Sequence, residues 1–175
     1  MSAAYYDIIT DEGSTFRLKL KFTDINKNSI NLLDPPTSII EGYEDQFPKD
    51  SNGNLLPINT YVRMQVRDSV DGDLILVEEN SLATQGDDET LWGQSDLDYS
   101  HIKIDLKDGK NSSTNKQDQP NIIITISADV MGKIPYGNFL YDIEILFSQD
   151  IIDHPNAIVY RIMQGRFVVT PNITR

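Results

Sequence analysis

A strict alternation of apolar and polar side chains, repeated in several short segments, is the feature that most constrains this chain. The clearest case is residues 16–22, where apolar side chains alternate with cations: Phe16, Leu18, Leu20 and Phe22 with Arg17, Lys19 and Lys21. A period of two puts the apolar side chains on one face of a β-strand and the cations on the other. The same alternation recurs in residues 62–67 and 102–107. We therefore expect three strands that each have one buried and one solvated face.

Further segments rich in β-forming residues raise the expected number of strands to about eight to ten. These segments are residues 5–10, 73–77, 122–126, 139–147, 157–163 and 166–170. The apolar period of an amphipathic helix is absent from the sequence, apart from a single turn over residues 127–133 that Ser127 would cap. The sequence therefore predicts one all-β domain over residues 1–175, an antiparallel sandwich with its core between two sheets. The side chains expected in that core are Phe16, Leu18, Leu20, Val62, Met64, Val66, Ile124, Tyr141, Ile143 and Val169.

The stretch that follows residue 122 narrows the expected fold further. Its order of strand, helical turn, Gly137 and aromatic-rich strand resembles the corner between the E and F strands of immunoglobulin-like sandwiches. In that corner a tyrosine hydroxyl reaches back to backbone groups of the turn. The resemblance implies an immunoglobulin-like antiparallel β-sandwich with long loop insertions, and it makes Tyr141 the candidate corner tyrosine.

Three long excursions interrupt the strands. Residues 34–60 hold four of the eight prolines, residues 80–98 carry an acidic GDDE run, and residues 107–120 have no large apolar side chain. Long loops in a compact domain usually carry function or become ordered on a partner. We expect residues 107–120 to form a mobile loop or a hairpin tip that folding does not need, and the other two excursions to contact neighbouring subunits.

Four large side chains in these excursions have no strand face on which to be buried. They are Tyr43, Phe47, Leu91 and Trp92. Aromatic anchors in loops are typical of protein interfaces, so the four form the candidate partner interface. A lid over the protein's own core is an equally good interpretation of the same residues, and a sugar-stacking platform is the third.

Composition excludes several classes of function. The chain has 15 Lys and Arg against 27 Asp and Glu, a formal net charge of -12, so neither nucleic acid nor an anionic membrane is an expected partner. It has no cysteine, which removes disulfides, thiolate metal sites and cysteine nucleophiles. It also lacks a signal-peptide pattern and any apolar run long enough to cross a bilayer, so we expect synthesis in the host cytoplasm without export.

Candidate catalytic and metal sites fail on their spacing. Asp24, Asn26 and Asn28 have the opening spacing of a calcium loop, but Ser29 occupies the position of the required glycine. The only histidines, His101 and His154, fit neither a metal-ligand spacing nor a nucleophile motif. We therefore expect no enzyme activity, no catalytic, cofactor-binding or metal-binding residues, no cofactor and no small-molecule ligand.

A series of short motifs, taken in order, resembles a known family. The motifs are GSTF at 13–16, YVRMQVRDS at 61–69, ITISADVMGKIPYGNFLYDIEI at 124–145 and VYRIMQGRFVVTPNITR at 159–175. Together they resemble a family of small virion proteins of tailed bacteriophages. In this chain Phe139 replaces the first tyrosine of the family's usual pair. The excursions at residues 34–60 and 80–120 exceed those of shorter members, so partner contacts made there cannot be carried over from the family.

The resemblance implies a non-catalytic structural component of the virion, in the tail, neck or baseplate. Such a protein acts through protein–protein contacts with other virion structural proteins, in multiple symmetric copies, and its expected location is the virion. A head decoration protein, or an adhesin-like module that binds host-surface carbohydrate, is the alternative. A cellular immunoglobulin-like adaptor ranks third.

Overall fold

The computed structural model describes residues 3–40, 47, 49–69, 74–80, 102–148 and 157–171. Within these residues almost all regular structure is β, as the alternation predicts. The elements, in chain order, are β1 (Ala4–Tyr5), β2 (Ile8–Asp11), β3 (Phe16–Leu20), the 3-10 helix η1 (Thr37–Ile40), β4 (Asn59–Arg67), β5 (Leu74–Asn80), β6 (Ile102–Leu106), β7 (Ile122–Ile126), α1 (Ala128–Met131), β8 (Gly137–Ser148) and β9 (Ile158–Thr170).

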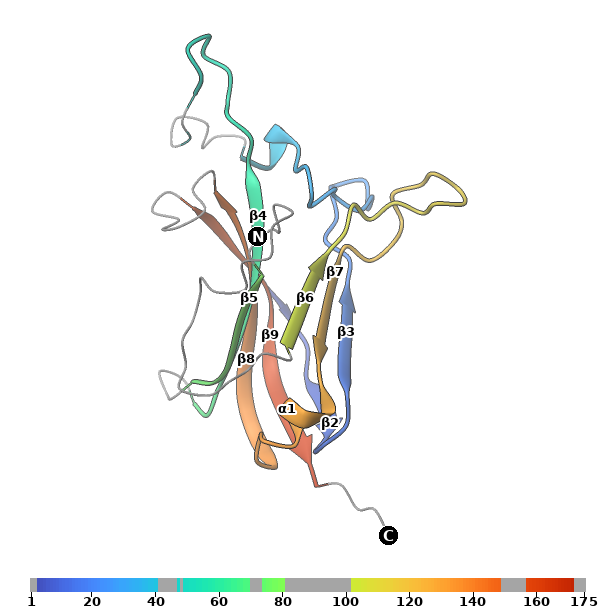
Figure 1. The fold of residues 1–175 in the computed structure, drawn as a ribbon, viewed down its shortest axis with the longest axis vertical. Coiled ribbons are helices and arrows are strands. Elements are labelled where there is room, and N and C mark those ends of the chain that lie inside the picture. Colours follow the sequence, from blue (N-terminus) through green and yellow to red (C-terminus); the bar gives the residue numbers. More distant parts are fainter. Residues whose placement is uncertain are drawn as a thin grey trace.

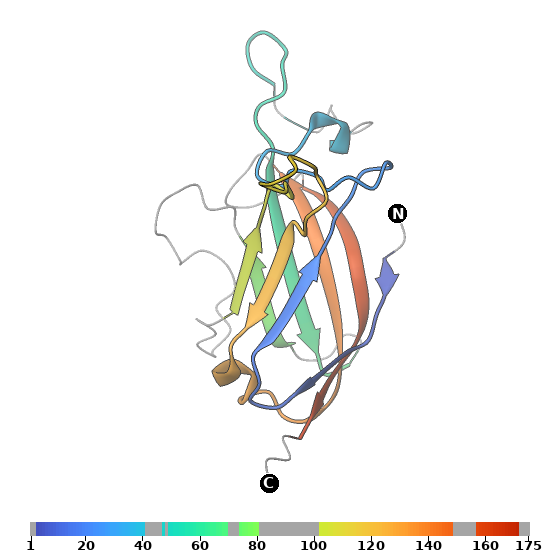
Figure 2. The same ribbon diagram turned by 90° about the vertical axis from the view of Figure 1, so that its right-hand side faces the viewer.

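The strands form two sheets that face one another (Figures 1 and 2). The large sheet has the order β1-β9-β8-β4-β5, and β2 also pairs with β9. The small sheet has the order β3-β7-β6. Strands β1 and β2 run parallel to β9, whereas every other described pairing is antiparallel.

The core lies between the two sheets and is built from the inward side of each alternating strand. Met64 of β4 pairs with Ile143 of β8, and both side chains are buried. Ile124 of β7 approaches from the small sheet and is fully buried. All ten side chains that the sequence assigns to the core belong to it or pack against it, so that prediction is confirmed.

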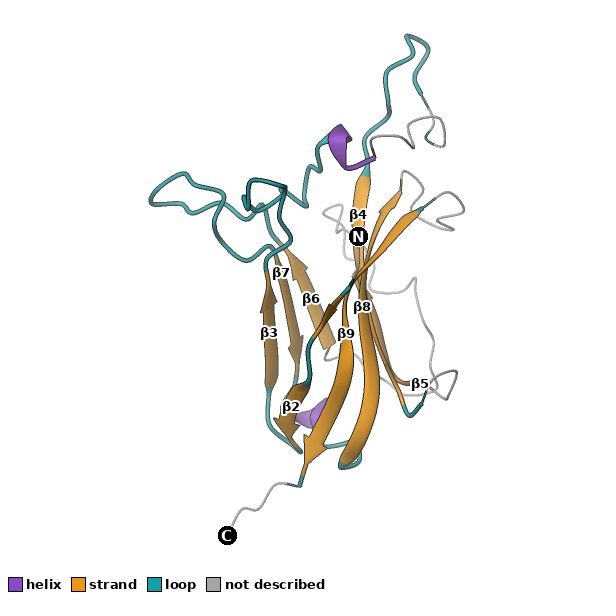
Figure 3. Cartoon of the chain, turned by 180° about the vertical axis from the view of Figure 1, so that it is seen from behind, coloured by secondary structure: helices purple, strands orange, loops and turns teal. Residues whose placement is uncertain are grey.

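The single helical turn expected after β7 is also present, as α1 (Figure 3). Ser127 caps it, because its side-chain oxygen accepts a hydrogen bond from the Val130 amide at 3.3 Å. Val130 and Met131 are fully buried and extend the core at this end of the molecule. The turn therefore links the two sheets while it closes one end of the space between them.

The N-terminal segment pairs with β9 and is held there by further hydrogen bonds. Strands β1 and β2 keep one register against β9, and between them the Asp7 carboxylate accepts a hydrogen bond from the Arg166 amide at 3.0 Å. The Tyr6 carbonyl passes over Gly165 and accepts the Tyr141 hydroxyl at 2.7 Å. Tyr141 thus bonds a backbone carbonyl, but one in the N-terminal segment and not in the turn before β8, which corrects the role expected for it.

Residues 107–120 form the tip of the hairpin that joins β6 to β7, which is one of the two structures expected for them, and hydrogen bonds hold this tip against Ser29. Ser29 donates from its amide to the Gln117 carbonyl at 2.7 Å and from its hydroxyl to the Gln119 carbonyl at 2.6 Å. Gly109 has a φ of +70° and packs directly against Ser29, where a side chain would collide. The apolar content of residues 107–120 does not predict this packing against Ser29, because most of the hydrogen bonds involve main-chain groups.

The unequal burial of two core residues gives a direct test of the packing. Replacing the fully buried Ile143 by alanine leaves a closed cavity and should lower the free energy of unfolding by about 2 to 5 kcal/mol. Leu20 is only partly buried, so Leu20→Ala should cost clearly less. Urea denaturation of the two variants measures both losses. Equal losses would contradict the burial difference.

The passage of the Tyr6 carbonyl over Gly165 gives a second test. A Cβ at position 165 would overlap that carbonyl, so Gly165→Ala should displace the N-terminal segment from β9. We expect faster amide hydrogen exchange in residues 8–11 with little change in β4. Tyr141→Phe is the control, because it removes only the hydroxyl bond and should cost about 0.5 to 1.5 kcal/mol. Native exchange rates in residues 8–11 of Gly165→Ala would disprove the steric argument.

Candidate functional site

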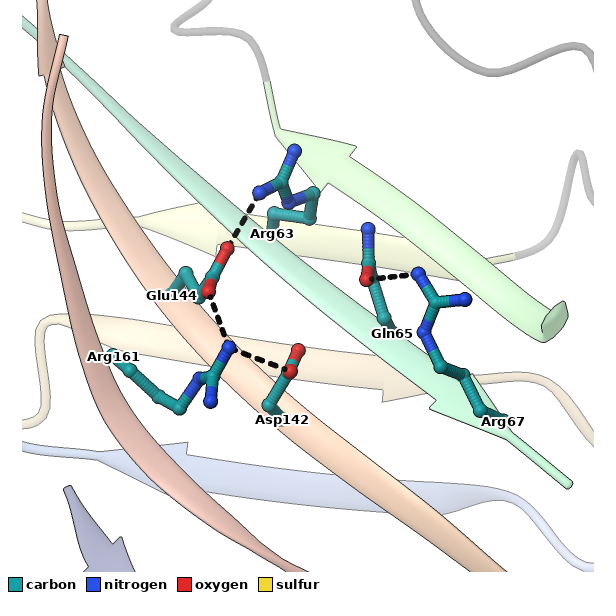
Figure 4. A network of polar contacts seen from close by, with 6 residues as sticks. All are labelled: Arg63, Gln65, Arg67, Asp142, Glu144 and Arg161. Atoms are coloured by element: carbon teal, nitrogen blue, oxygen red, sulfur yellow. Dashed lines mark hydrogen bonds and ion pairs between the residues drawn. The ribbon is translucent and has the colours of Figure 1, made fainter. Parts of the chain in front are cut away.

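The outer face of the large sheet carries a group of polar side chains, most of them charged, which Figure 4 shows. They alternate with core residues along three adjacent strands, and we call them the arginine–carboxylate network: Arg63, Gln65 and Arg67 of β4, Asp142 and Glu144 of β8, and Arg161 of β9. Since the inward neighbours of these residues fill the core, the same period of two places all six on the outside.

Cross-strand register brings opposite charges together in this network. Arg63 pairs with Glu144 between β4 and β8, and Glu144 pairs with Arg161 between β8 and β9. The second pairing depends on a bulge, because the register shifts so that Ile162 has no partner on β8. Without that extra residue Ile162 would face Glu144, and Arg161 would point to the other side of the sheet.

Glu144 is the centre of the network. Its carboxylate accepts from Arg63 Nη2 at 2.5 Å and from Arg161 Nη2 at 3.2 Å, and its side chain is only 11% exposed. The same Arg161 nitrogen lies 3.4 Å from the Asp142 carboxylate. Arg67 donates to the Gln65 side chain at 3.0 Å. Two guanidinium groups therefore hold one nearly buried carboxylate between them.

The two carboxylates have opposite shifts in pKa. Burial would raise the pKa of Glu144, but the hydrogen bond and charge of Arg63, together with those of Arg161, outweigh burial and lower it. For Asp142, burial and the nearby negative charge of Glu144 raise the pKa, and the arginines offset this only in part. Glu144 is thus held as an anion, whereas ionised Asp142 is destabilised.

The network retains polar groups that no described residue satisfies. Arg63 Nε and Asp142 Oδ1 are buried and have no hydrogen-bond partner within the described ranges. The residues Arg63 and Asp142 also line a concavity of about 610 Å³ on the sheet surface. Other side chains that line it include Tyr5, Gln65, Ser69 and Gln164. Charged groups, side-chain amides and hydroxyl groups line this concavity, which suits the face to polar recognition of a partner.

The candidate interface residues identified from the sequence are not part of this face. Tyr43, Leu91 and Trp92 lie outside the described residues. Phe47 is 4% exposed and belongs to the core cluster, so at this position the lid interpretation is correct and the partner-anchor interpretation is wrong. Tyr141 lies on the inward side of the sheet, where burial, and then the negative charge of Asp7, raise the pKa of its phenol.

The arginine–carboxylate network was not identified from the sequence. Local alternation nevertheless indicates which of its side chains lie on an outer face. The alternation of Arg63, Gln65 and Arg67 with apolar residues places all three on an outer face, and the same holds for Asp142 and Glu144. Which arginine meets which carboxylate depends on register and on the bulge at Ile162. Neither of these can be obtained from local periodicity.

Metal-binding groups, membrane-spanning helices and similar sequences would each be further evidence of function. Among the described residues, no group of three or more Asp, Glu or His side chains is arranged to hold a metal ion. None of the described helices has the length and apolar character needed to cross a membrane. No protein-family model matches the chain, and no curated protein sequence matches it significantly.

Neutral variants of the two carboxylates should change stability in opposite directions. Glu144→Gln removes the anion between Arg63 and Arg161 and should lower the free energy of unfolding by about 1 to 3 kcal/mol at neutral pH. Asp142→Asn removes a destabilised charge and should raise stability at neutral pH. Urea denaturation across the acidic and neutral range measures both effects.

The pH dependence of these variants follows from the pKa directions. A lowered pKa in the folded state means that Glu144 stabilises the fold above its unfolded pKa and loses this effect as the pH falls through the folded value. The raised pKa of Asp142 means the reverse, so the advantage of Asp142→Asn should shrink as the pH falls below the folded value and vanish below the unfolded value. Identical pH profiles for wild type and both variants would contradict the assignment.

Proposed function

We propose that this protein is a non-catalytic structural component of a tailed-bacteriophage virion, in the tail, neck or baseplate. It acts through contacts with other virion structural proteins, in multiple symmetric copies. The observation that carries the proposal is the outer face of the large sheet, where Glu144 and two arginines present a fixed pattern of charge on a rigid surface. A pre-organised polar surface of this kind suits docking between subunits, because little side-chain entropy is lost on contact.

We further infer an immunoglobulin-like strand arrangement. The order β3-β7-β6 corresponds to strands B, E and D of that fold, and the order β9-β8-β4-β5 corresponds to G, F, C and C′ of its variable type. The α1 turn falls between the strands equivalent to E and F. This fold commonly serves in recognition and assembly, and the motif order that resembles phage virion proteins supports the same role.

Fractionated particles test the location. Virions are separated into tails and heads, and both fractions are quantified by mass spectrometry. We expect the protein in the tail fraction in a fixed ratio to other tail proteins. Recovery only with heads would favour the head decoration alternative, and glycan binding that depends on Trp92 would favour the adhesin. Absence from particles, or a hydrolytic activity of the pure protein, would contradict the proposal.

A matched pair of tyrosine variants tests the docking face. Tyr5 borders the concavity beside the arginine–carboxylate network, whereas Tyr136 lies outside it between α1 and β8, and each is 68% exposed. Both Tyr5→Ser and Tyr136→Ser should leave the subunit folded. Only Tyr5→Ser should lower incorporation into tails, because truncation of an exposed interface tyrosine weakens binding. Equal incorporation of the two variants would show that the docking surface does not include this face.

A further inference from the structure

The two flanks of the space between the sheets are closed to different degrees. On the β6 flank, the inward side chains Ile104 and Leu106 are 5% and 8% exposed, and β6 contacts β5 of the opposite sheet. On the β3 flank, Phe16, Leu18 and Leu20 are only partly buried, although their partners on β7 are fully buried. The core is therefore covered along β6 and open along β3, the outermost strand of the small sheet in Figure 2.

An apolar groove runs along this open flank. It encloses about 360 Å³ between β3 on one side and β1 and β9 on the other. Its apolar lining includes Leu20, Phe22, Ile162 and Met163, each of them partly exposed. Ile162 is the extra residue of the β9 bulge, so the irregularity that turns Arg161 outward also places an apolar side chain in the groove.

The backbone edge of β3 beside this groove is free within the described part of the chain. Strand β3 is the end of its sheet and pairs only with β7 there. A terminal strand presents a row of unpaired amide and carbonyl groups that can accept a further strand. The edge and the groove are adjacent, because Lys19, Leu20 and Lys21 line the groove.

The outer face of the small sheet is basic, in contrast to the rest of the molecule. It carries five exposed cations and one carboxylate: Arg17, Lys19, Lys21, Lys103 and Lys107 with Asp105. The remainder of the chain therefore has ten cations and 26 carboxylates. Lys103 pairs with Asp105 at 3.1 Å, but Arg17 and Lys19 on β3 have no ion-pair partner among the described residues. The free edge is thus flanked by two cations that no described carboxylate neutralises.

We propose that β3 binds an extended segment of a partner protein in which apolar residues alternate with acidic residues. The segment adds to the free edge as a new strand through main-chain hydrogen bonds. Its apolar side chains enter the groove over Ile162 and Met163, and its carboxylates lie beside Arg17 and Lys19. Both sets follow a period of two, so one strand satisfies them together. This inference deepens the proposed assembly function and rests on it.

Neither aggregation control nor nucleic-acid binding accounts for the basic edge as fully. Charged residues on an edge strand can serve solely to prevent aggregation. That role would explain the cations of β3, but it does not explain the open apolar groove beneath the edge. A nucleic acid would use the cations but has no apolar side chains to fill the groove, and the net charge of -12 repels it. The alternating protein segment uses the edge, the groove and the cations.

A synthetic peptide of alternating valine and glutamate, about ten residues long, is the probe. Binding to the full chain is measured by fluorescence anisotropy, and the bound strand is located by hydrogen exchange of the amides of residues 16–20. We expect binding with increased protection of those amides.

The double variant Arg17→Glu, Lys19→Glu should weaken binding by about tenfold or more, because it places like charges beside the peptide carboxylates. Lys103→Glu, on the same face but on β6, is the matched control and should change affinity by less than about threefold.

Several outcomes would overturn the inference. They are equal binding of a valine–lysine peptide, full competition by a single-stranded oligonucleotide, and protection in β6 instead of β3. Self-association of an Arg17→Ala, Lys19→Ala variant without peptide binding would assign the cations to aggregation control.

Incorporation into phage particles distinguishes failure of this inference from failure of the assembly function on which it rests. Tails that incorporate the glutamate double variant normally would exclude the edge and leave the assembly role intact, whereas absence of the wild-type protein from particles would contradict that role.

Discussion

Antiparallel pairing of β8 with β4 on one side and β9 on the other determines both faces of the large sheet. On the inward face this register stacks Met64, Ile143 and Met163, and on the outward face it aligns Arg63, Glu144 and Arg161. The core and the charged surface therefore share one set of main-chain hydrogen bonds. A slip of one residue would bury the charges and expose the apolar side chains, so the cost of burying Glu144 unpaired protects the register.

Polar side chains that bond distant main-chain groups organise the rest of the molecule. Asn121, which is fully buried, accepts from the Phe22 amide at 2.7 Å and donates to the carbonyls of Phe22 and Ile30. Ser29 holds residues 107–120 in the same manner, and Asp7 completes the pairing of the N-terminal segment with β9. Buried main-chain groups must find partners, and here short polar side chains supply them where the strands end.

Charge is distributed unevenly over this acidic chain, and the two outer sheet faces hold most of the arginines. On the large sheet Arg63 and Arg161 are matched by the carboxylates of Asp142 and Glu144, which makes a fixed and nearly neutral pattern around Glu144. On the small sheet Arg17 and Lys19 are not matched by described residues, and they lie beside an open flank of the core. The proposed assembly role uses this difference, because one face offers rigid polar contacts and the other offers an edge that can accept a strand.

The sequence by itself determined the β class, the inward and outward sides of the clearly alternating strands, the ten core residues and the turn at Ser127. These features are local, because an alternation with a period of two, or a helix cap, depends only on residues that are close in sequence. Only the tertiary structure decided the burial of Phe47, the outward turn of Arg161 at the bulge, the docking of residues 107–120 on Ser29, and the bond from Tyr141 to Tyr6. The last two bonds join residues 90 and 135 positions apart, so they exist only after the sheets have closed. Contacts of this kind depend on register and on main-chain groups, which are the same in every residue and leave no pattern in the sequence.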